Sequence, residues 1–247
     1  SYSDLGDLCA TYKPVAVADF DGDGKDEILL ENGMILFFRK NSSNQWECGT
    51  IMSPISSTDK VYCGDFNGDG NQDVVMVNGI NSQGELSVFL AQSAGQFSAP
   101  KYIAKGDGMG GPMGIMMDDF DHDKNADILT LVYGTLGNYL HVFYGDGKGN
   151  FSKPDSFSTK SNYSMCFAGG DFNEDGHTDL AILENYVSIG GSNKIVVTYA
   201  DANGRFTNAP VNLTGTTGYA LYCNDLNEDT HEDLIVTGAT QTDIYFG

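Results

Sequence analysis

Five short stretches of the sequence place oxygen-bearing side chains at positions 1, 3, 5 and 9 of a nine-residue turn. In residues 65–73 these positions hold Asp65, Asn67, Asp69 and Asp73, and Gly70 stands at position 6. Calcium takes six to eight oxygen ligands, and a short loop can supply them when alternate residues point inward and a glycine takes the sharp bend. The backbone carbonyl of position 7 would add one more oxygen. This spacing therefore predicts a calcium-binding loop.

A solvated polar turn has no reason to keep one spacing five times along a chain, so the repetition favours metal binding over that alternative. Lys124 and Thr230 replace the position-6 glycine in the third and fifth copies, and we expect weaker sites there because the bend disfavours a side chain. The predicted ligands, position 7 included, are Asp19, Asp21, Asp23, Lys25 and Glu27; Asp65, Asn67, Asp69, Asn71 and Asp73; Asp119, Asp121, Asp123, Asn125 and Asp127; Asp171, Asn173, Asp175, His177 and Asp179; and Asp225, Asn227, Asp229, His231 and Asp233.

An EF-hand begins with the same acidic pattern, but it requires a bidentate Glu at position 12 and a helix on each side. Position 12 is Leu30 in the first loop and Met76 in the second. Short apolar runs follow these loops at residues 28–30 and 74–77, which is typical of β-strands. We therefore predict that the loops are turns between strands.

The spacing of the loops shows that the chain is a repeat. Their first aspartates are 46, 54, 52 and 54 residues apart, and a period of about fifty residues indicates propeller blades or solenoid turns. With 247 residues, a single domain is expected. Its five units would span about 13–53, 59–104, 113–159, 164–214, and 218–247 together with 1–12.

Each unit is predicted to hold four antiparallel strands. One strand enters the acidic loop, a second leaves it, a hairpin leads to a third, and a glycine-containing turn leads to a fourth. In the first unit these strands would be residues 15–18, 28–31, 34–39 and 45–51. Gly-x-Phe segments ending at Phe97, Phe151 and Phe206 mark the turn into the fourth strand.

Loop position 2 is always apolar, and we expect its side chain to pack each loop onto the neighbouring unit. The residues at this position are Phe20, Phe66, Phe120, Phe172 and Leu226.

The Asp-Phe-Asn/Asp-x-Asp-Gly-x-x-Asp core with a following Gly-x-Phe resembles the FG-GAP and VCBS repeats over essentially the whole chain. These repeats form the propellers of integrin α-subunits, of some fungal lectins and of domains attached to secreted enzymes. The resemblance implies a calcium-binding β-propeller in an extracellular, secreted setting, with calcium turns joining the first and second strands of each blade. Up to five Ca²⁺ ions are expected.

The fold expected is all-β, a five-bladed propeller closed by the N-terminal strand. The fifth unit reaches Gly247 after three strands, and Ser1-Tyr2-Ser3 matches the Asn150-Phe151-Ser152 segment that leads into a fourth strand. We therefore expect residues 1–12 to complete the last blade. The alternative is that the five copies are part of a larger propeller.

The composition limits the kinds of molecule that the protein is expected to bind. The net charge is −21, and 21 of the 34 acidic residues lie in the five loops, so much of the acidity is ligand charge. Such a surface disfavours nucleic acid and anionic membranes. No stretch has the length of a membrane span. The chain begins without Met, as a processed secreted protein would.

The five cysteines show no metal-binding spacing, and Cys63 and Cys223 are expected to be buried thiols rather than a disulfide.

The sequence offers no catalytic residues. His122, His177 and His231 lie inside the loops, His141 lies within an expected strand, and hydrolase and phosphate-loop motifs are absent. We therefore expect a non-catalytic binding or adhesion module for a glycan or an extracellular protein. Two alternatives stay open, a self-assembling subunit of an extracellular fibre or coat and an accessory domain of a secreted enzyme.

Overall fold

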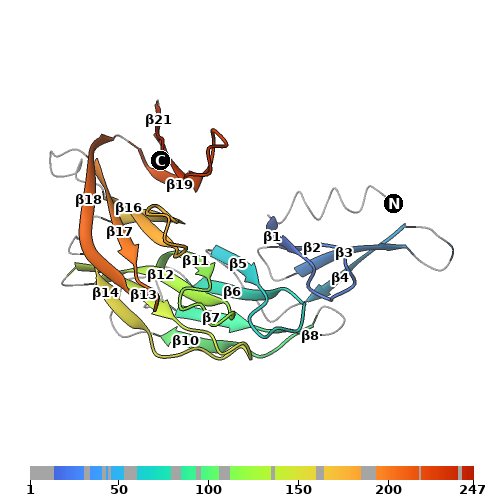
Figure 1. Cartoon of the computed structure of the whole chain (residues 1–247). Coiled ribbons are helices and arrows are strands. Elements are labelled where there is room, and N and C mark those ends of the chain that lie inside the picture. The colour runs from blue at the N-terminus through green and yellow to red at the C-terminus, as the bar shows by residue number, and fades with distance from the viewer. Residues whose placement is uncertain are drawn as a thin grey trace. The chain divides into compact units, whose positions relative to one another are not determined.

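The computed structural model describes residues 14–30, 34–40, 43, 46–52, 60–78, 85–92, 96–105, 112–134, 137–159, 164–184, 193–216, 218–238 and 241–247. These residues form β-strands and no helix (Figure 1), which confirms the all-β prediction. The chain divides into two compact units, Ser1–Gly111 with Gly145–Phe151, and Pro112–Tyr144 with Ser152–Gly247. Each unit is described by itself.

The first unit contains two four-stranded antiparallel sheets. One has the order β1 (Pro14–Ala18), β2 (Glu27–Leu30), β3 (Met34–Lys40) and β4 (Trp46–Met52). The other consists of β5 (Lys60–Gly64), β6 (Asp73–Asn78), β7 (Glu85–Phe89) and β10 (Lys101–Lys105), and a small hairpin of β8 (Ala91–Gln92) and β9 (Gln96–Phe97) precedes its last strand.

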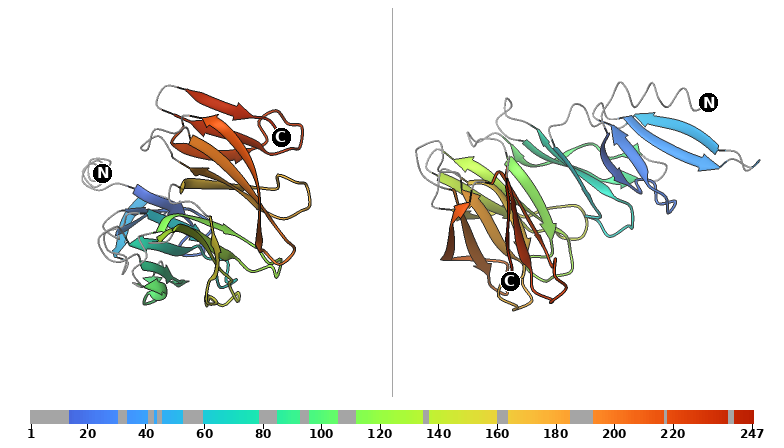
Figure 2. Two further views of the ribbon diagram at one scale, coloured as in Figure 1. Left: turned by 90° about the vertical axis from the view of Figure 1, so that its left-hand side faces the viewer. Right: turned by 90° about the horizontal axis from the view of Figure 1, so that it is seen from above.

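The second unit contains three antiparallel sheets. The first is β11 (Pro112–Asp118), β12 (Asp127–Gly134), β13 (Gly137–Phe143) and β14 (Asp155–Ser158), and the second is β15 (Ser164–Gly170), β16 (Asp179–Glu184), β17 (Asn193–Ala200) and β18 (Phe206–Thr216). The last sheet, red in Figure 2, has only β19 (Ala220–Asn224), β20 (Asp233–Thr237) and β21 (Thr242–Tyr245).

The predicted four-strand order is therefore confirmed in four sheets, and an acidic loop joins the first and second strands of all five. The last sheet shows the three strands expected of it. The fourth strand predicted from residues 1–12 lies outside the described residues, so the closure and the number of blades stay predictions.

Consecutive sheets within a unit pack face to face, with their first strands next to one another. Strand β1 contacts β5, β11 contacts β15, and β15 contacts β19. The second strand of each sheet is the most enclosed, and every residue of β16 is buried, because its two faces meet two neighbouring sheets. Each fully buried Leu or Ile contributes about 1.5–3 kcal/mol to folding. The cores between sheets thus hold the loop-bearing strand ends in place.

Aromatic pairs pack three of the acidic loops against Gly-x-Phe turns further along the chain. Loop position 2 meets the Gly-x-Phe aromatic in three places: Phe20 with Phe97, Phe66 with Phe151, and Phe120 with Phe206, at centroid distances of 5.7, 5.6 and 6.2 Å. All three pairs have the edge-to-face geometry that aromatic rings prefer. This confirms the predicted role of position 2 in the first three loops. In the fifth loop Leu226 is 44% exposed.

Candidate metal centres

The aspartate at loop position 1 organises each turn. In the first loop Asp19 Oδ1 accepts backbone N–H groups from Gly22 and Asp23 at 2.7 and 3.2 Å, and Oδ2 accepts the N–H of Gly24 at 2.8 Å. The second loop repeats these bonds around Asp65. One carboxylate therefore holds three successive amides, which closes the turn without any partner from outside.

The side chains at positions 3 and 5 are also held by the loop's own backbone. Asp21 Oδ1 accepts the N–H of Asp23 at 3.2 Å, and Asp23 Oδ1 accepts that of Lys25 at 3.0 Å. Asn67 and Asp69 make the equivalent bonds in the second loop. Because these bonds aim alternate oxygens toward the inside of the turn, several acceptors collect there before any ion arrives.

The carboxylate at position 9 is the buried anchor of the loop. Asp73 is fully buried; its Oδ2 accepts the N–H of Phe66 at 2.9 Å and its Oδ1 accepts that of Ala91 at 2.7 Å. Asp179 bonds in the same way to Phe172 and Ala200. Asp233 does so to Leu226 and Gly247. Position 9 therefore ties the loop to the end of the third strand, in addition to its predicted role as a ligand.

Burial raises the pKa of two of these anchors, Asp73 and Asp179. The pKa of Asp73 is raised to about 6, chiefly by desolvation and further by the charges of Asp69 and Asp65, although two backbone N–H groups oppose the shift. The pKa of Asp179 is raised to about 6 for the same first reason. Carboxylates that crowd together in this way favour a bound cation, which offsets their mutual repulsion.

Two groups of carboxylates among the described residues could hold a metal ion. The oxygens of Asp19, Asp21 and Glu27 lie within 4.8 Å of one another, and so do those of Asp119, Asp121 and Asp127. Both loops carry Asp at position 3, where the other three have Asn. An amide oxygen is also a calcium ligand, but it adds no charge.

The third loop has an acceptor that its own backbone leaves unused. Asp119 Oδ2 accepts the N–H of Lys124 at 2.9 Å, but its Oδ1 is buried and has no hydrogen-bond partner. In the other four loops the equivalent oxygen accepts the N–H of position 5. A buried carboxylate oxygen without a partner is costly, so this atom fits a cation ligand.

The glycine substitutions leave the turn conformation unchanged. At position 6 Lys124 and Thr230 have φ of 74° and 76°, in the same left-handed region as Gly70 at 88°. Position 4 also has positive φ in every loop, which the sequence analysis did not anticipate. It is glycine in the first two loops but His122, Glu174 and Glu228 in the others.

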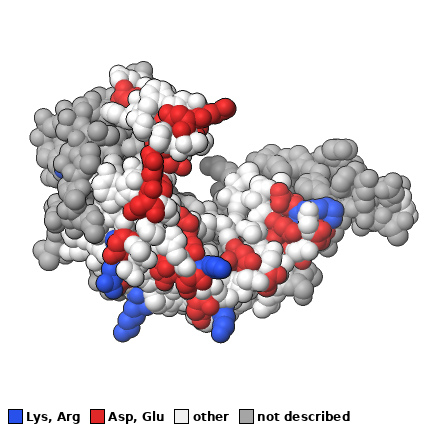
Figure 3. Space-filling model, in the orientation of Figure 1, with Lys and Arg blue, Asp and Glu red and all other residues white. Residues whose placement is uncertain are grey.

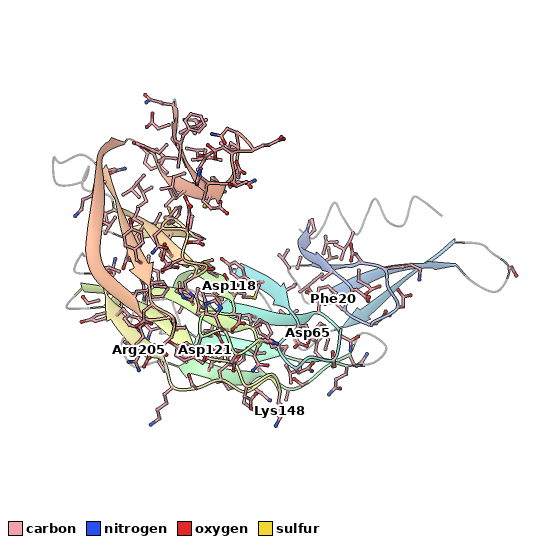
Figure 4. All side chains as sticks on the ribbon, in the orientation of Figure 1. Phe20, Asp65, Asp118, Asp121, Lys148 and Arg205 are labelled. Atoms are coloured by element: carbon pink, nitrogen blue, oxygen red, sulfur yellow. The ribbon has the colours of Figure 1, made fainter. Side chains whose placement is uncertain are left out.

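The fourth loop touches the third and the fifth through positions 4 and 7, a second feature that sequence reasoning missed. His177 at position 7 of the fourth loop faces His122 at position 4 of the third, with Nδ1 and Nε2 2.5 Å apart. The same two positions meet between the next two loops, where Nδ1 of His231 in the fifth loop lies 2.6 Å from Oε1 of Glu174 in the fourth. A further hydrogen bond lies next to the position-9 side of these loops: Thr178 Oγ1 donates to Oδ2 of Asp118, which is labelled in Figure 4. The repeat period is the sequence feature that could have predicted these contacts, because it brings residues that are 55 positions apart side by side.

A cleft of about 310 Å³ lies beside the third loop and is lined by Asp121, Tyr144, Asp155, Asn203 and Arg205. Asp121 and Arg205 are labelled in Figure 4. Arg205 Nε lies 3.9 Å from Oδ2 of Asp155. Burial, and next the charge of Asp155, raise the pKa of Tyr144 to about 12, so its hydroxyl stays a hydrogen-bond donor at neutral pH. The cleft therefore presents both donors and acceptors.

A serine and a histidine lie close together on the sheet β11–β14, at a distance slightly longer than that of a typical general-base contact. Ser156 Oγ lies 3.3 Å from Nδ1 of His141, and the histidine is 5% exposed. A general base acts within about 2.6–3.2 Å of the proton that it takes.

Cys63 and Cys223 do not form a disulfide with each other, which confirms the prediction for this pair. Burial raises the pKa of the Cys63 thiol to about 12. Burial, and then the hydrogen bond of its Sγ to Glu232, raise the pKa of Cys223.

Acidic side chains dominate the charged surface seen in Figure 3, where Lys and Arg are few and scattered. Within the described parts of the chain, no helix has the length and hydropathy needed to cross a membrane.

Residues 32–130 match the family model described as FG-GAP-like repeat. The predicted resemblance to FG-GAP repeats is thus confirmed over a segment that contains the second and third loops. Among curated proteins, none matches the sequence.

The chain is similar to a solved structure described as the Dos1 propeller, with a TM-score of 0.54 and 12% identity over 90% of this chain and 51% of that one. At this identity the similarity shows a propeller fold alone. A rhamnogalacturonan lyase PL11 of Bacillus licheniformis matches at 13% identity over 87% of this chain and 49% of that one, with a TM-score of 0.44 that carries no structural argument. The chain spans about half the length of these two structures.

Proposed function

We propose that this chain, which carries FG-GAP-like repeats, is a calcium-binding β-propeller that acts outside the cell as a non-catalytic binding module. The observation that carries the proposal is the set of converging carboxylate oxygens in the first and third loops. Asp119 Oδ1, which is buried without a partner, supports it most directly. A turn that binds no cation gains nothing from bringing several carboxylate oxygens together, because their charges repel one another.

Calcium suits these loops because it prefers hard oxygen donors in numbers that one turn can supply. The side chains at positions 1, 3, 5 and 9 and the carbonyl of position 7 would hold it. When bound, the ion supplies two positive charges that offset the repulsion among the carboxylates. Without the ion, the carboxylate at position 1 closes the turn, and the carboxylate at position 9 ties it to the backbone near the end of the third strand.

The calcium affinity that we expect for these loops supports the extracellular setting. Calcium sites of extracellular modules typically bind with dissociation constants of about 10⁻⁴ to 10⁻³ M. A protein that depends on several such sites is stabilised where calcium is millimolar.

Five closed blades are the arrangement we propose for the whole propeller. Strand β21 pairs only with β20 among the described strands, so one of its edges can accept another strand. Residues 1–12 are our candidate for that strand. Removing them should lower the melting temperature strongly, and an unchanged melting temperature would favour a larger propeller completed by other blades.

The cleft beside the third loop supports a polar ligand, and we favour a saccharide. Its volume of about 310 Å³ is at the lower end of the range typical of ligand pockets. A sugar hydroxyl can accept a hydrogen bond from Arg205 while donating one to Asp155, and the Tyr144 hydroxyl, which donates to the carbonyl of Asn203 at 3.5 Å, can accept one from the sugar. An extracellular protein with exposed polar side chains is the alternative ligand.

Glycan-array binding in millimolar calcium tests this function. We expect specific binding by the parent protein, at least tenfold weaker binding by Arg205→Ala, and no change for Lys153→Ala, an exposed cation outside the cleft. Calcium titration calorimetry on the same samples tests the metal sites separately. Absence of calcium binding would overturn the proposal as a whole, whereas calcium binding without any glycan signal would overturn only the saccharide.

Self-assembly is the second candidate, and the last sheet favours it. Large apolar side chains gather there and are exposed: Tyr219 57%, Tyr222 56%, Ile244 46% and Phe246 64%. Exposed apolar groups on a sheet with an open edge can join copies of one chain. Polymers in negative-stain images at millimolar calcium would support this candidate, and monomers at high concentration would exclude it.

A further inference from the structure

We propose that His122 and His177 form a second kind of cation site, which binds a borderline transition metal such as Zn²⁺ and cross-links the third and fourth loops. The site is separate from the oxygen-lined interior of the loops. It lies where position 4 of one loop meets position 7 of the next, within the second unit.

The two rings face each other through nitrogen atoms. His122 Nε2 and His177 Nδ1 are 2.5 Å apart, the ring centroids are 4.5 Å apart, and the ring planes are tilted by 59°. Two imidazole nitrogens at 2.5 Å share a proton, and a metal ion that replaces this proton needs them further apart. With zinc–nitrogen bonds of about 2.0–2.1 Å, tetrahedral coordination places the two nitrogens about 3.3 Å apart. A movement of less than about 1 Å would therefore suffice.

Neither ring is needed for calcium. Position 4 is not a predicted ligand, and position 7 is predicted to use its backbone carbonyl, so the His177 ring is available for another ion. The donor types also separate the two metals, because imidazole nitrogen suits zinc, copper and nickel, whereas calcium prefers oxygen. The acidic residues around the two histidines add a favourable field for any cation.

The contact between the fourth and fifth loops provides a natural comparison. There the same two positions hold Glu174 and His231, whose atoms lie 2.6 Å apart as an ion pair when the histidine is protonated. A carboxylate oxygen can also bind zinc, but it is the harder donor of the two and suits calcium and magnesium as well. The paired imidazoles of His122 and His177 have two equivalent donors instead, which makes this contact the better transition-metal site.

Zinc titration calorimetry on the full chain in about 5 mM calcium tests the proposal. We expect one zinc ion per chain, and at least tenfold weaker zinc binding for His122→Asn and for His177→Gln. Asparagine is chosen at residue 122 because it tolerates the positive φ of 61° there. His231→Gln is the matched control, and it should bind zinc like the parent protein.

Calcium affinity and the melting temperature, measured for each variant, show whether the fold is intact. Unchanged zinc affinity in His122→Asn or His177→Gln would overturn the proposal, and so would an equal loss in His231→Gln. Zinc that calcium displaces in competition would place the zinc in the acidic loops and would also overturn it. A protein that binds zinc through these histidines but takes no calcium would refute the proposed function and leave this site standing.

Discussion

Replacing Asp73 by asparagine should separate the two roles of loop position 9. The carboxylate of Asp73 accepts buried N–H groups from Phe66 at 2.9 Å and from Ala91 at 2.7 Å. Asparagine keeps one oxygen and puts an NH₂ group in the place of the other, so one buried N–H faces a second donor. The variant should therefore be less stable even when no calcium is bound.

The magnitude follows from the lost acceptor. Leaving a buried donor without a partner costs about 1–3 kcal/mol. For a chain of this size, each kcal/mol corresponds to about 2–4 °C in melting temperature, so we expect a decrease of about 2 to 12 °C. This decrease should be present in both calcium and EDTA.

The matched control is Asp69→Asn, the same substitution at position 5 of the same loop. Asp69 is exposed, and its Oδ1 accepts the N–H of Asn71, a bond that asparagine can keep. Its Oδ2 accepts a hydrogen bond from Nδ2 of Asn67 at the surface, where water can replace the lost partner. Thermal melting by circular dichroism should show little loss for this variant in EDTA and a loss in millimolar calcium. If the two variants were equally stable in EDTA, the structural role assigned to position 9 would be refuted.

Four further outcomes are expected. Excess EDTA should lower the melting temperature of the parent protein, and Asp69→Ala should reduce the calcium-dependent part more than Asp229→Ala does, because the fifth loop lacks its glycine; an unchanged midpoint in EDTA would contradict calcium binding. Thr230→Gly should raise stability by about 1 kcal/mol in urea melts, since it relieves a β-branched residue at φ 76°. Phe120→Ala should cost about 3–5 kcal/mol, because Phe120 is 3% exposed, and more than Leu226→Ala, which removes a half-exposed side chain; similar losses would argue against the aromatic pairing. Screens with glycoside, ester and phosphoester substrates should show no hydrolysis, and turnover abolished by one substitution outside the loops would refute the non-catalytic assignment.

The sequence by itself determined the local features of this protein. The spacing of Asp65, Asn67, Asp69 and Asp73 predicted a closed turn, and the apolar runs on either side predicted the strands that it joins. These predictions succeed because both features depend on residues within about ten positions of one another. Hydrogen bonds from an aspartate to the amides that follow it form wherever that short segment is placed. The left-handed conformation at position 6 was predicted for the same reason.

Only the tertiary structure decided which loops touch and how the anchors are used. The facing rings of His122 and His177 come from residues 55 apart, and Asp73 reaches the amide of Ala91, 18 residues away and just beyond the third strand. Such contacts depend on the twist and separation of neighbouring strands and sheets, which no single strand encodes. The left-handed conformation of His122 at position 4 was likewise hidden, because a side chain there is tolerated rather than required. The repeat period indicated that neighbouring loops would meet, but packing between the sheets determined which side chains are in contact.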